Sequence, residues 1–430
     1  MDRKRVLILG AGLSGLSAAW HLKDKRVDYL VLEKEDEVGG LCRSKRTGGF
    51  TFDYDGHLLH FRHHYVFNLV RSLLKDNLRQ HDRSAWVYAH NCYLPYPFQA
   101  NLHGLPSSVV KECLLGLMSA SRNGRLKKSD NFLEWIINAF GKGIARNFMI
   151  PYNSKFWTLP PQSLNCEWLD GFVPVPSFSQ IIEGTIGRSR RKFGYNAKFW
   201  YPRRGGIEQL GQAFASNLKN VFTNSPVTEI NLAKKEIMVG QREKIKYDYL
   251  IYTLPLPEIV YLMKGLPRES AVLAKKLRWN SILNVNLGVA RKDIYRRHWV
   301  YFPQKSISFF RVGFYHNFSG EIVPPGASGI YAEVSYSKEK PIGRKNILNR
   351  IKRDLKKVGI LDKADSIKTV DINDIKYGYP IYDSQYNLAR DNIIKELGRH
   401  DIIACGRYGS WRYFSMEDAI LDGRRAASLI

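Results

Sequence analysis

Residues 5–22 read RVLILGAGLSGLSAAWHL, and this stretch decides the fold. Its apolar run at residues 6–9 is short and is followed by glycine, which predicts a buried parallel strand. Gly10, Gly12 and Gly15 follow with the spacing G-x-G-x-x-G, and apolar residues then recur at helical intervals up to Leu22. Strand, glycine turn and helix in this order are typical of a dinucleotide-binding unit.

Each glycine of this fingerprint has its own physical task. The first allows a tight turn, the second lets the backbone approach a pyrophosphate, and the third lets helix and strand pack closely. The pyrophosphate would lie at the helix N-terminus, where free N–H groups and the helix dipole favour an anion. A second predicted strand at residues 29–32 ends in Glu33, close to the ~20 residues after the glycines at which a carboxylate binds ribose hydroxyls.

The residues that follow Glu33 favour FAD over NAD. Gly39 and Gly40, with Arg43 and Ser44 shortly after, resemble the extended flavoprotein pattern E-x-x-x-x-x-G-G. The resemblance implies that this second glycine pair and the nearby Arg and Ser lie along the FAD. A surface Gly-Gly turn is the alternative interpretation of the pair.

Charge is the unusual feature of the composition. Among 430 residues, 66 Lys and Arg against 40 Asp and Glu give a net charge of +26, which attracts nucleotides, nucleic acid or an anionic membrane. Residues 346–358 combine an apolar stripe with basic residues, which favours a packed surface helix over contact with nucleic acid or peripheral contact with an anionic membrane. The chain enters its first strand directly and has no apolar run of ~18 residues, so we expect a cytoplasmic protein. Five scattered cysteines without zinc spacing predict reduced thiols and no metal site.

The order of predicted elements indicates an α/β protein: a Rossmann-like FAD-binding domain with a helical insertion, and a second domain built on an antiparallel sheet. Residues 66–150 look mostly helical, except for a loop around 93–99 that contains two prolines. Alternating strands are expected at 280–289, 309–315 and 329–335. We expect an FAD-binding domain from residues 1–65, 196–265 and 386–430, a largely helical substrate domain at 66–195, and an antiparallel-sheet substrate domain at 266–385.

Beyond the fingerprint, nearly the whole chain resembles the UDP-galactopyranose mutases of the eukaryotic type, within the flavin amine oxidase and protoporphyrinogen oxidase superfamily. The distinctive segments are DGHLLHF (55–61), LPYPFQANL (94–102), PYNSKFWTLP (151–160), NAKFWYPRRGG (196–206) and GRYGSWRY (406–413). The glycine fingerprint alone would indicate only the superfamily, whereas PYNSKFW and GRYGSWRY are far more specific.

The resemblance implies a redox-neutral pyranose–furanose mutase, an isomerase of nucleotide-diphosphate sugars such as UDP-galactopyranose, used in cell-surface polysaccharide biosynthesis. The active cofactor would be reduced FAD, with the flavin as nucleophile, and NAD(P)H is implied as the reductant. The expected partner is a nucleotide sugar and not a nucleic acid, and nothing in the sequence gives the oligomeric state. The protein itself would position the substrate and stabilise the leaving diphosphate.

The resemblance also assigns roles to individual residues, with Phe148 stacking on uracil and Arg407 touching the flavin. The implied catalytic residues are His57, Tyr301, Arg311, Tyr379 and Tyr413. The cofactor-binding residues are Gly10, Gly12, Gly15, Glu33, Gly39, Gly40, Arg43, Ser44, Val227, Gly406, Arg407, Ser415 and Met416. The substrate-binding residues are Tyr96, Gln99, Phe148, Asn153, Trp157 and Asn196.

Two positions depart from the family pattern. Phe172 occupies the place of a second diphosphate-binding arginine, and Ser415 lies where the family has an asparagine. Loss of one arginine weakens the stabilisation of a diphosphate, which favours a second function, a flavin-dependent oxidase or desaturase acting on an apolar substrate. A third alternative, a non-catalytic binder of nucleic acid or membrane surfaces, has the charge but no nucleic-acid motif.

Overall fold

A five-stranded parallel sheet forms the first layer of the molecule. The computed structural model describes residues 5–122, 129–169, 172–187, 194 and 197–430. The sheet has the order β20-β13-β1-β2-β9, with Leu9 of the central strand opposite Leu32 on one side and Tyr252 on the other. Its strands are β1 (Arg5–Leu9), β2 (Asp28–Leu32), β9 (Val221–Phe222), β13 (Tyr249–Tyr252) and β20 (Ile402–Ala404).

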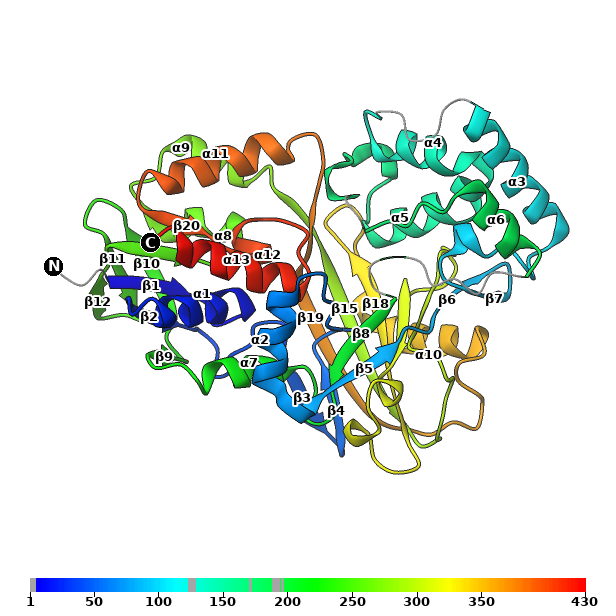
Figure 1. The fold of residues 1–430 in the computed structure, drawn as a ribbon, viewed down its shortest axis with the longest axis horizontal. Coiled ribbons are helices and arrows are strands. Elements are labelled where there is room, and N and C mark those ends of the chain that lie inside the picture. Colours follow the sequence, from blue (N-terminus) through cyan, green and yellow to red (C-terminus); the bar gives the residue numbers. More distant parts are fainter. Residues whose placement is uncertain (1–4, 123–128, 170–171, 188–193, 195–196) are drawn as a thin grey trace.

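Helices from both ends of the chain pack together beside this sheet. Helix α1 (Leu13–Asp24), blue in Figure 1, lies against α13 (Met416–Ser428), which is red. The two helices approach closely because Gly423 faces the backbone of Ser14, where a side chain would not fit. The neighbouring helices are α2 (His64–Leu74), α7 (Glu208–Ala215), α8 (Leu256–Leu262), α9 (Arg268–Ala274), α11 (Tyr386–Gly398) and α12 (Gly406–Gly409).

A seven-stranded sheet in the order β19-β15-β18-β17-β16-β6-β7 forms the second layer. All its pairs are antiparallel except β16 with β6, and α10 (Ile347–Lys357) covers one face through Ile351 and Leu355. The predicted α/β fold class with an antiparallel sheet is therefore confirmed. The strands are β6 (Ala85–Ala89), β7 (Cys92–Pro95), β15 (Arg278–Val289), β16 (Trp299–Tyr301), β17 (Arg311–Phe314), β18 (Ser328–Tyr336) and β19 (Ile367–Ile381).

The expectation that residues 66–150 are mostly helical is wrong for residues 78–95. Strands β6 and β7 of this segment pair with each other as a hairpin, which the sequence interpretation missed. β6 also pairs with β16, and β5 (Leu78–Asp82) pairs with β8 (Lys198–Pro202), partners that lie more than a hundred residues away and that no short sequence window contains. Strand β7 lies at the sheet edge, which is where prolines such as Pro95 are tolerated.

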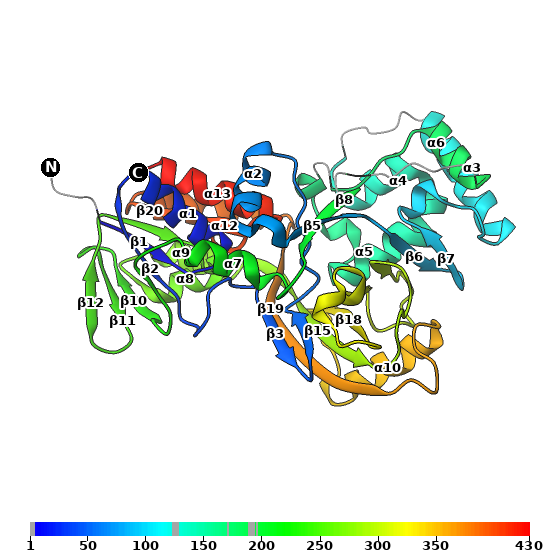
Figure 2. The same cartoon turned by 60° about the horizontal axis from the view of Figure 1, so that its bottom comes forward.

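Figure 2 shows a helical part at the far end of the molecule from the parallel sheet. It contains α3 (Ser107–Arg122), α4 (Phe132–Ile144), α5 (Ile150–Phe156) and α6 (Phe178–Thr185), with a π-helical turn at Ala145–Met149 that joins α4 to α5. None of the helices in the described ranges combines the length and apolar character needed to cross a bilayer. The remaining strands are β3 (Ser44–Thr47), β4 (Phe50–Asp53), β10 (Val227–Asn231), β11 (Glu236–Val239), β12 (Glu243–Lys246) and β14 (Met263–Lys264).

The contact between α1 and β1 gives a testable prediction. A Cβ at Gly15 would overlap the carbonyl oxygen of Gly10, and backbone cannot move aside as a flexible side chain does. We expect Gly15→Ala to destabilise the fold by at least about 2 kcal/mol, seen as a lower midpoint of thermal unfolding. Gly398→Ala in α11 is the matched control, because no atom lies within 4 Å of the added Cβ and alanine favours a helix. Equal midpoints for the two variants would contradict this account of the helix–strand contact.

Candidate active site

The end of β1 and the start of α1 form an open backbone cradle. Gly10 has a φ of 97°, and Gly12 is the extended N-cap residue of α1. A Cβ at Gly12 would meet only the Cα of Gly40, at 3.9 Å, so the space beside this glycine is bounded by backbone. These features fit a pyrophosphate held near the first N–H groups of the helix.

Glu33 is fixed beside this cradle at the carboxyl end of β2. Its side chain is only 7% exposed, and its two oxygens accept hydrogen bonds from the N–H groups of Ala11 at 2.7 Å and Glu35 at 3.1 Å. A carboxylate has about four acceptor positions, so Glu33 can still accept a ribose hydroxyl. Val227 begins β10 shortly after Ser225, whose N–H bonds to the carbonyl of Glu33 at 2.7 Å.

The second glycine pair lies directly against the first turn. The N–H of Gly39 donates to the carbonyl of Ala11 at 2.8 Å, and Nε of Arg43 donates to the carbonyl of Gly40 at 2.8 Å. Ser44 has a different environment, because its buried hydroxyl donates to the carboxyl of Asp53 at 2.6 Å. The two glycine segments thus make one continuous cradle, and Ser44 supports it from within a buried polar cluster.

The C-terminal segment closes on the same cradle. A Cβ at Gly406 would overlap Oγ of Ser14 in α1, and the N–H of Gly406 donates to Asp422 at 2.7 Å. Ser415 is the N-cap of α13 and accepts a hydrogen bond from the N–H of Asp418 at 3.2 Å, so Met416 is the first residue of that helix. The Ser415 hydroxyl is therefore already used in capping.

Arg407 is a cation for which the described residues offer no carboxylate partner. Its guanidinium lies 4.6 Å from the ring centre of Tyr379 and 5.3 Å from that of Tyr413, and its Nε is buried without a hydrogen-bond partner in the described structure. Burial raises the pKa of both tyrosines, so their hydroxyls stay protonated and can donate. An unpaired, buried N–H of a guanidinium between two phenols suits an anionic ligand.

Arg311, by contrast, is held by carboxylates of the protein itself. Its Nε and Nη2 bind the two oxygens of Glu333 on the adjacent strand, and Nη2 lies 3.8 Å from Oδ1 of Asp55. Burial opposes the charge of Arg311, but the adjacent Glu333 carboxylate raises the pKa of the guanidinium well above its usual value, and Asp55 adds to this shift. Tyr301 lies opposite Arg311 in the β16–β17 register. The charge of Arg311 is therefore balanced within the protein.

His57 follows β4 and lies near both arginines. Burial lowers the pKa of its imidazole, Asp55 opposes the shift, and the positive charges of Arg407 and Arg311 add to it. Its Nδ1 lies 3.3 Å from the carbonyl oxygen of Asp55. The ring is thus expected to be neutral at physiological pH, an uncharged group beside two guanidinium groups.

Arg407, Arg311, His57, Tyr379 and Tyr413 form one cluster of side chains, and a row of stacked aromatic rings borders it. The ring centres of Phe98, Phe148, Tyr152 and Phe156 follow one another at 5.0, 5.3 and 6.3 Å. Phe156 then meets Tyr379 at 4.7 Å, and Tyr379 stacks with Tyr413 at 5.5 Å. Tyr152 and Phe156 were missed by the sequence reasoning, although their spacing of four from Phe148 places all three on one helical face.

Of the five predicted substrate residues that the structure describes, all except the partly exposed Tyr96 are buried. Phe148 is only 4% exposed and stacks on Phe98 and Tyr152, so little of its ring is free to stack on a base. Tyr96 lies 5.3 Å from Tyr301, ring centre to ring centre. Gln99, Asn153 and Trp157 are also buried, and Asn196 falls outside the described residues.

Phe172, the position at which an arginine was expected, does lie at this cluster. Its ring meets Tyr413 edge to face, with the two centres 4.7 Å apart. It therefore supports the tyrosine that contacts Arg407 and contributes no charge. Glu333, Asp55 and Phe310 complete the cluster and were not predicted, because strand pairing and loop closure bring them here.

The comparisons with known proteins agree with this geometry. The chain is 25% identical over 263 residues to a probable UDP-galactopyranose mutase of Klebsiella pneumoniae, covering 60% of this chain and 62% of that protein. It is 24% identical over 312 residues to protoporphyrinogen oxidase 2 of Arabidopsis thaliana, covering 61% and 60%. The matches thus span about three fifths of the length of these curated relatives.

A crystal structure of reduced UDP-galactopyranose mutase superposes with a TM-score of 0.95 at 29% identity, covering 100% of this chain and 94% of that one. The resemblance expected from the motifs is therefore confirmed. The sequence profile of the flavin containing amine oxidoreductases matches residues 13–430. Because that match takes in nearly the whole chain, the protein belongs to the flavin containing amine oxidoreductase family.

Proposed function

We propose that the protein is an FAD-dependent, redox-neutral pyranose–furanose mutase of a nucleotide-diphosphate sugar, UDP-galactopyranose or a relative. The observation that carries the proposal is the guanidinium of Arg407 between Tyr379 and Tyr413, with its Nε unpaired. This arrangement suits the oxygens of a leaving diphosphate. The similarity to reduced UDP-galactopyranose mutase over the whole chain supports the same activity.

The residues present fit FAD. Gly12 and Gly40 leave a backbone cradle, the start of α1 offers N–H groups to the pyrophosphate, and Glu33 is placed for a ribose hydroxyl. Gly406 begins α12 and Met416 begins α13, so two further helix starts lie beside that of α1. When bound in its reduced form, the flavin supplies the nucleophile, and we infer NAD(P)H as the source of its electrons.

The task of the protein's own side chains is to hold the diphosphate and to order the sugar. Arg407 contributes a positive charge, and Tyr379 and Tyr413 contribute neutral O–H donors, which need no reorganisation as charge develops on the diphosphate oxygens. Arg311 is oriented by Glu333, and so it presents a fixed charge beside Tyr301. His57, as a neutral ring, can accept or donate a hydrogen bond beside these groups.

The stacked row on α5 excludes water from one side of the site, which strengthens every electrostatic contact within it. We assign Tyr96, Gln99, Asn153 and Trp157 to the binding of the nucleotide, with their buried polar atoms as the supporting observation. The side-chain oxygen of Gln99 and the indole N–H of Trp157 are buried without a hydrogen-bond partner in the described structure.

A flavin-dependent oxidase or desaturase is the second candidate. The edge-to-face contact of Phe172 with Tyr413 favours it, because an apolar ring stands where a diphosphate site would gain from a second cation. The match to protoporphyrinogen oxidase 2 of Arabidopsis thaliana supports the same class.

One experiment separates the two candidates. Dithionite-reduced, flavin-loaded protein is incubated without oxygen with a panel of nucleotide hexoses and pentoses, and products are resolved by chromatography. We expect a furanose product to accumulate over many turnovers without consumption of reductant. Hydrogen peroxide formed in air in proportion to an oxidised product would instead identify the oxidase.

Substitution of Arg407 tests the diphosphate assignment. We expect Arg407→Gln to reduce turnover at least ~100-fold, the scale of losing one oxyanion donor, and to weaken the binding of uridine diphosphate. Arg412→Gln is the matched control, because it removes the same charge from an exposed position on the same loop. Isothermal titration measures the binding and initial rates measure the turnover. An equal loss in the two variants would show that only the net charge of the protein matters, and would contradict a specific role for Arg407.

Arg311 is tested with a single and a double variant, because removing it alone leaves Glu333 buried without its cation. We expect Arg311→Ala to lower turnover at least ~100-fold and also to lower the unfolding midpoint. Adding Glu333→Gln removes the uncompensated carboxylate, so the double variant should recover stability and not turnover. Wild-type turnover in the double variant would show that Arg311 serves the fold alone.

A further inference from the structure

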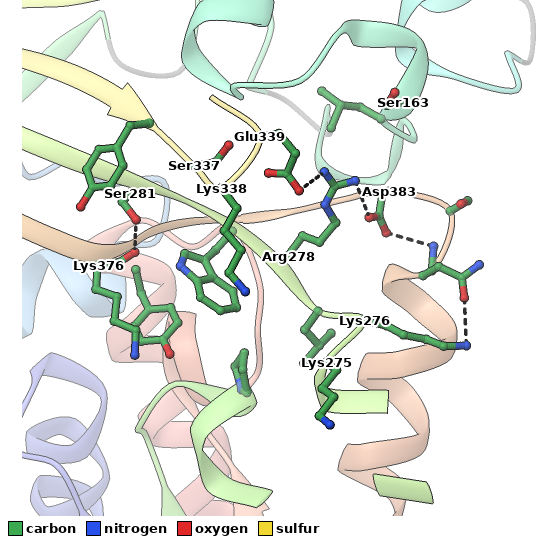
Figure 3. Close-up of a pocket in the computed structure, with 18 of the residues that line it drawn as sticks. Ser163, Lys275, Lys276, Arg278, Ser281, Ser337, Lys338, Glu339, Lys376 and Asp383 are labelled. Atoms are coloured by element: carbon green, nitrogen blue, oxygen red, sulfur yellow. Dashed lines mark hydrogen bonds and ion pairs between the residues drawn. The ribbon is translucent and has the colours of Figure 1, made fainter. Parts of the chain in front are cut away.

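A cleft of about 1590 Å³ lies against β15 and β19 (Figure 3). Successive residues of a strand point to opposite faces, so Trp279 and Ser281 line the cleft while Asn280 and Ile282 face the aromatic row. A bulge in β19 opposite Ser281 adds residues to that strand and places Tyr377 on the cleft side.

The floor of the cleft is aromatic and sealed. The rings of Trp279 and Tyr377 lie 4.8 Å apart, and Trp411 packs behind them with its ring centre 6.2 and 5.9 Å away. Trp411 is fully buried and belongs to the segment that carries Arg407 and Tyr413. A molecule in the cleft would therefore lie behind the candidate active site, separated from it by this layer of rings.

Six cationic side chains and four carboxylates line the cleft. Three of the cations are paired: Arg278 with Glu339 at 2.7 Å, Lys376 with Glu258 at 2.7 Å, and Arg344 with Asp374 at 2.5 Å.

The other three cations are Lys275, Lys276 and Lys338, for which no carboxylate partner exists within the described ranges. Lys276 reaches only the amide oxygen of Gln385, at 3.3 Å. Figure 3 shows Lys338 descending from the loop after β18 while Lys275 extends from the turn before β15. The three ammonium groups thus come from different segments around the cleft.

We propose that this cleft is a second ligand site that takes a nucleoside phosphate, with its base against Trp279 and Tyr377 and its phosphates among Lys275, Lys276 and Lys338. Aromatic rings hold a base by stacking, and unpaired ammonium groups around the same cleft suit a ligand that also carries several negative charges, as a di- or triphosphate does. The cleft exceeds the ~300–1,000 Å³ of most small-molecule sites, so a whole nucleotide fits.

The test is calorimetric titration of the flavin-loaded, full-length protein with ATP. We expect Lys275→Gln/Lys338→Gln to weaken ATP binding at least about tenfold, the scale of losing charge-assisted contacts. Lys356→Gln/Lys357→Gln on α10 is the matched control, because it removes the same charge from exposed positions outside the cleft. An equal loss in both double variants would overturn the proposal in favour of a general effect of net charge.

Two further titrations locate the ligand and define its class. Tyr379→Phe should leave ATP affinity unchanged if ATP occupies the cleft, whereas a loss would place ATP at the candidate active site and overturn the proposal. Tripolyphosphate should bind at least about tenfold more weakly than ATP because it lacks the stacking base. Equal affinity for the two would refute the aromatic part of the site. Neither outcome depends on mutase activity, so this proposal can fail while the proposed function stands.

Discussion

The pairing of Arg311 with Glu333 is the interaction around which the candidate site is arranged. The two residues face each other across β17 and β18, and Glu333 is completely buried. A buried carboxylate costs several kcal/mol unless a cation and hydrogen bonds compensate it, so strand register fixes the position of Arg311. Asp55 approaches the same guanidinium from the loop after β4, which brings His57 to the site. Arg311 is thus charge-balanced, and Arg407 is the guanidinium available to an incoming anion.

The strands that support this site also separate it from the large cleft. Asn280 donates to the carbonyl of Phe156 at 2.7 Å and accepts from the N–H of Tyr379 at 2.8 Å, so it joins the aromatic row to β19. Its neighbour Trp279 points the other way and forms the cleft floor with Tyr377. A single pair of strands therefore carries a candidate site on each face, and Trp411, in the segment that positions Arg407, packs behind the cleft floor.

The sequence predicted what is local and left out what depends on distant pairing. The glycine fingerprint and Glu33 lie within one βαβ unit, and backbone geometry alone requires their spacing, so fold class and cofactor cradle could be predicted. The hairpin of β6 and β7 is local and was missed. The pairing of β5 and β6 with β8 and β16 could not be predicted, because these partners lie far along the chain. For the same reason Glu333 gave no signal, since only the β17–β18 register places it against Arg311. The family motifs supplied Arg407, but its lack of a carboxylate partner is a property of the folded molecule.

Phe172 shows how such a site can function with few cations. Its ring holds Tyr413 edge to face, and Tyr413 stacks with Tyr379, so the two phenols beside Arg407 form a rigid pair. Rigid neutral donors stabilise developing charge without the desolvation cost that a second buried guanidinium would bring. The attraction of an anion from solution is then a task for the net charge of +26, whose field acts at long range. In the proposed function, capture and stabilisation thus belong to different parts of the molecule: the charged surface would concentrate the anion, and the buried cage of one guanidinium and two phenols would hold it.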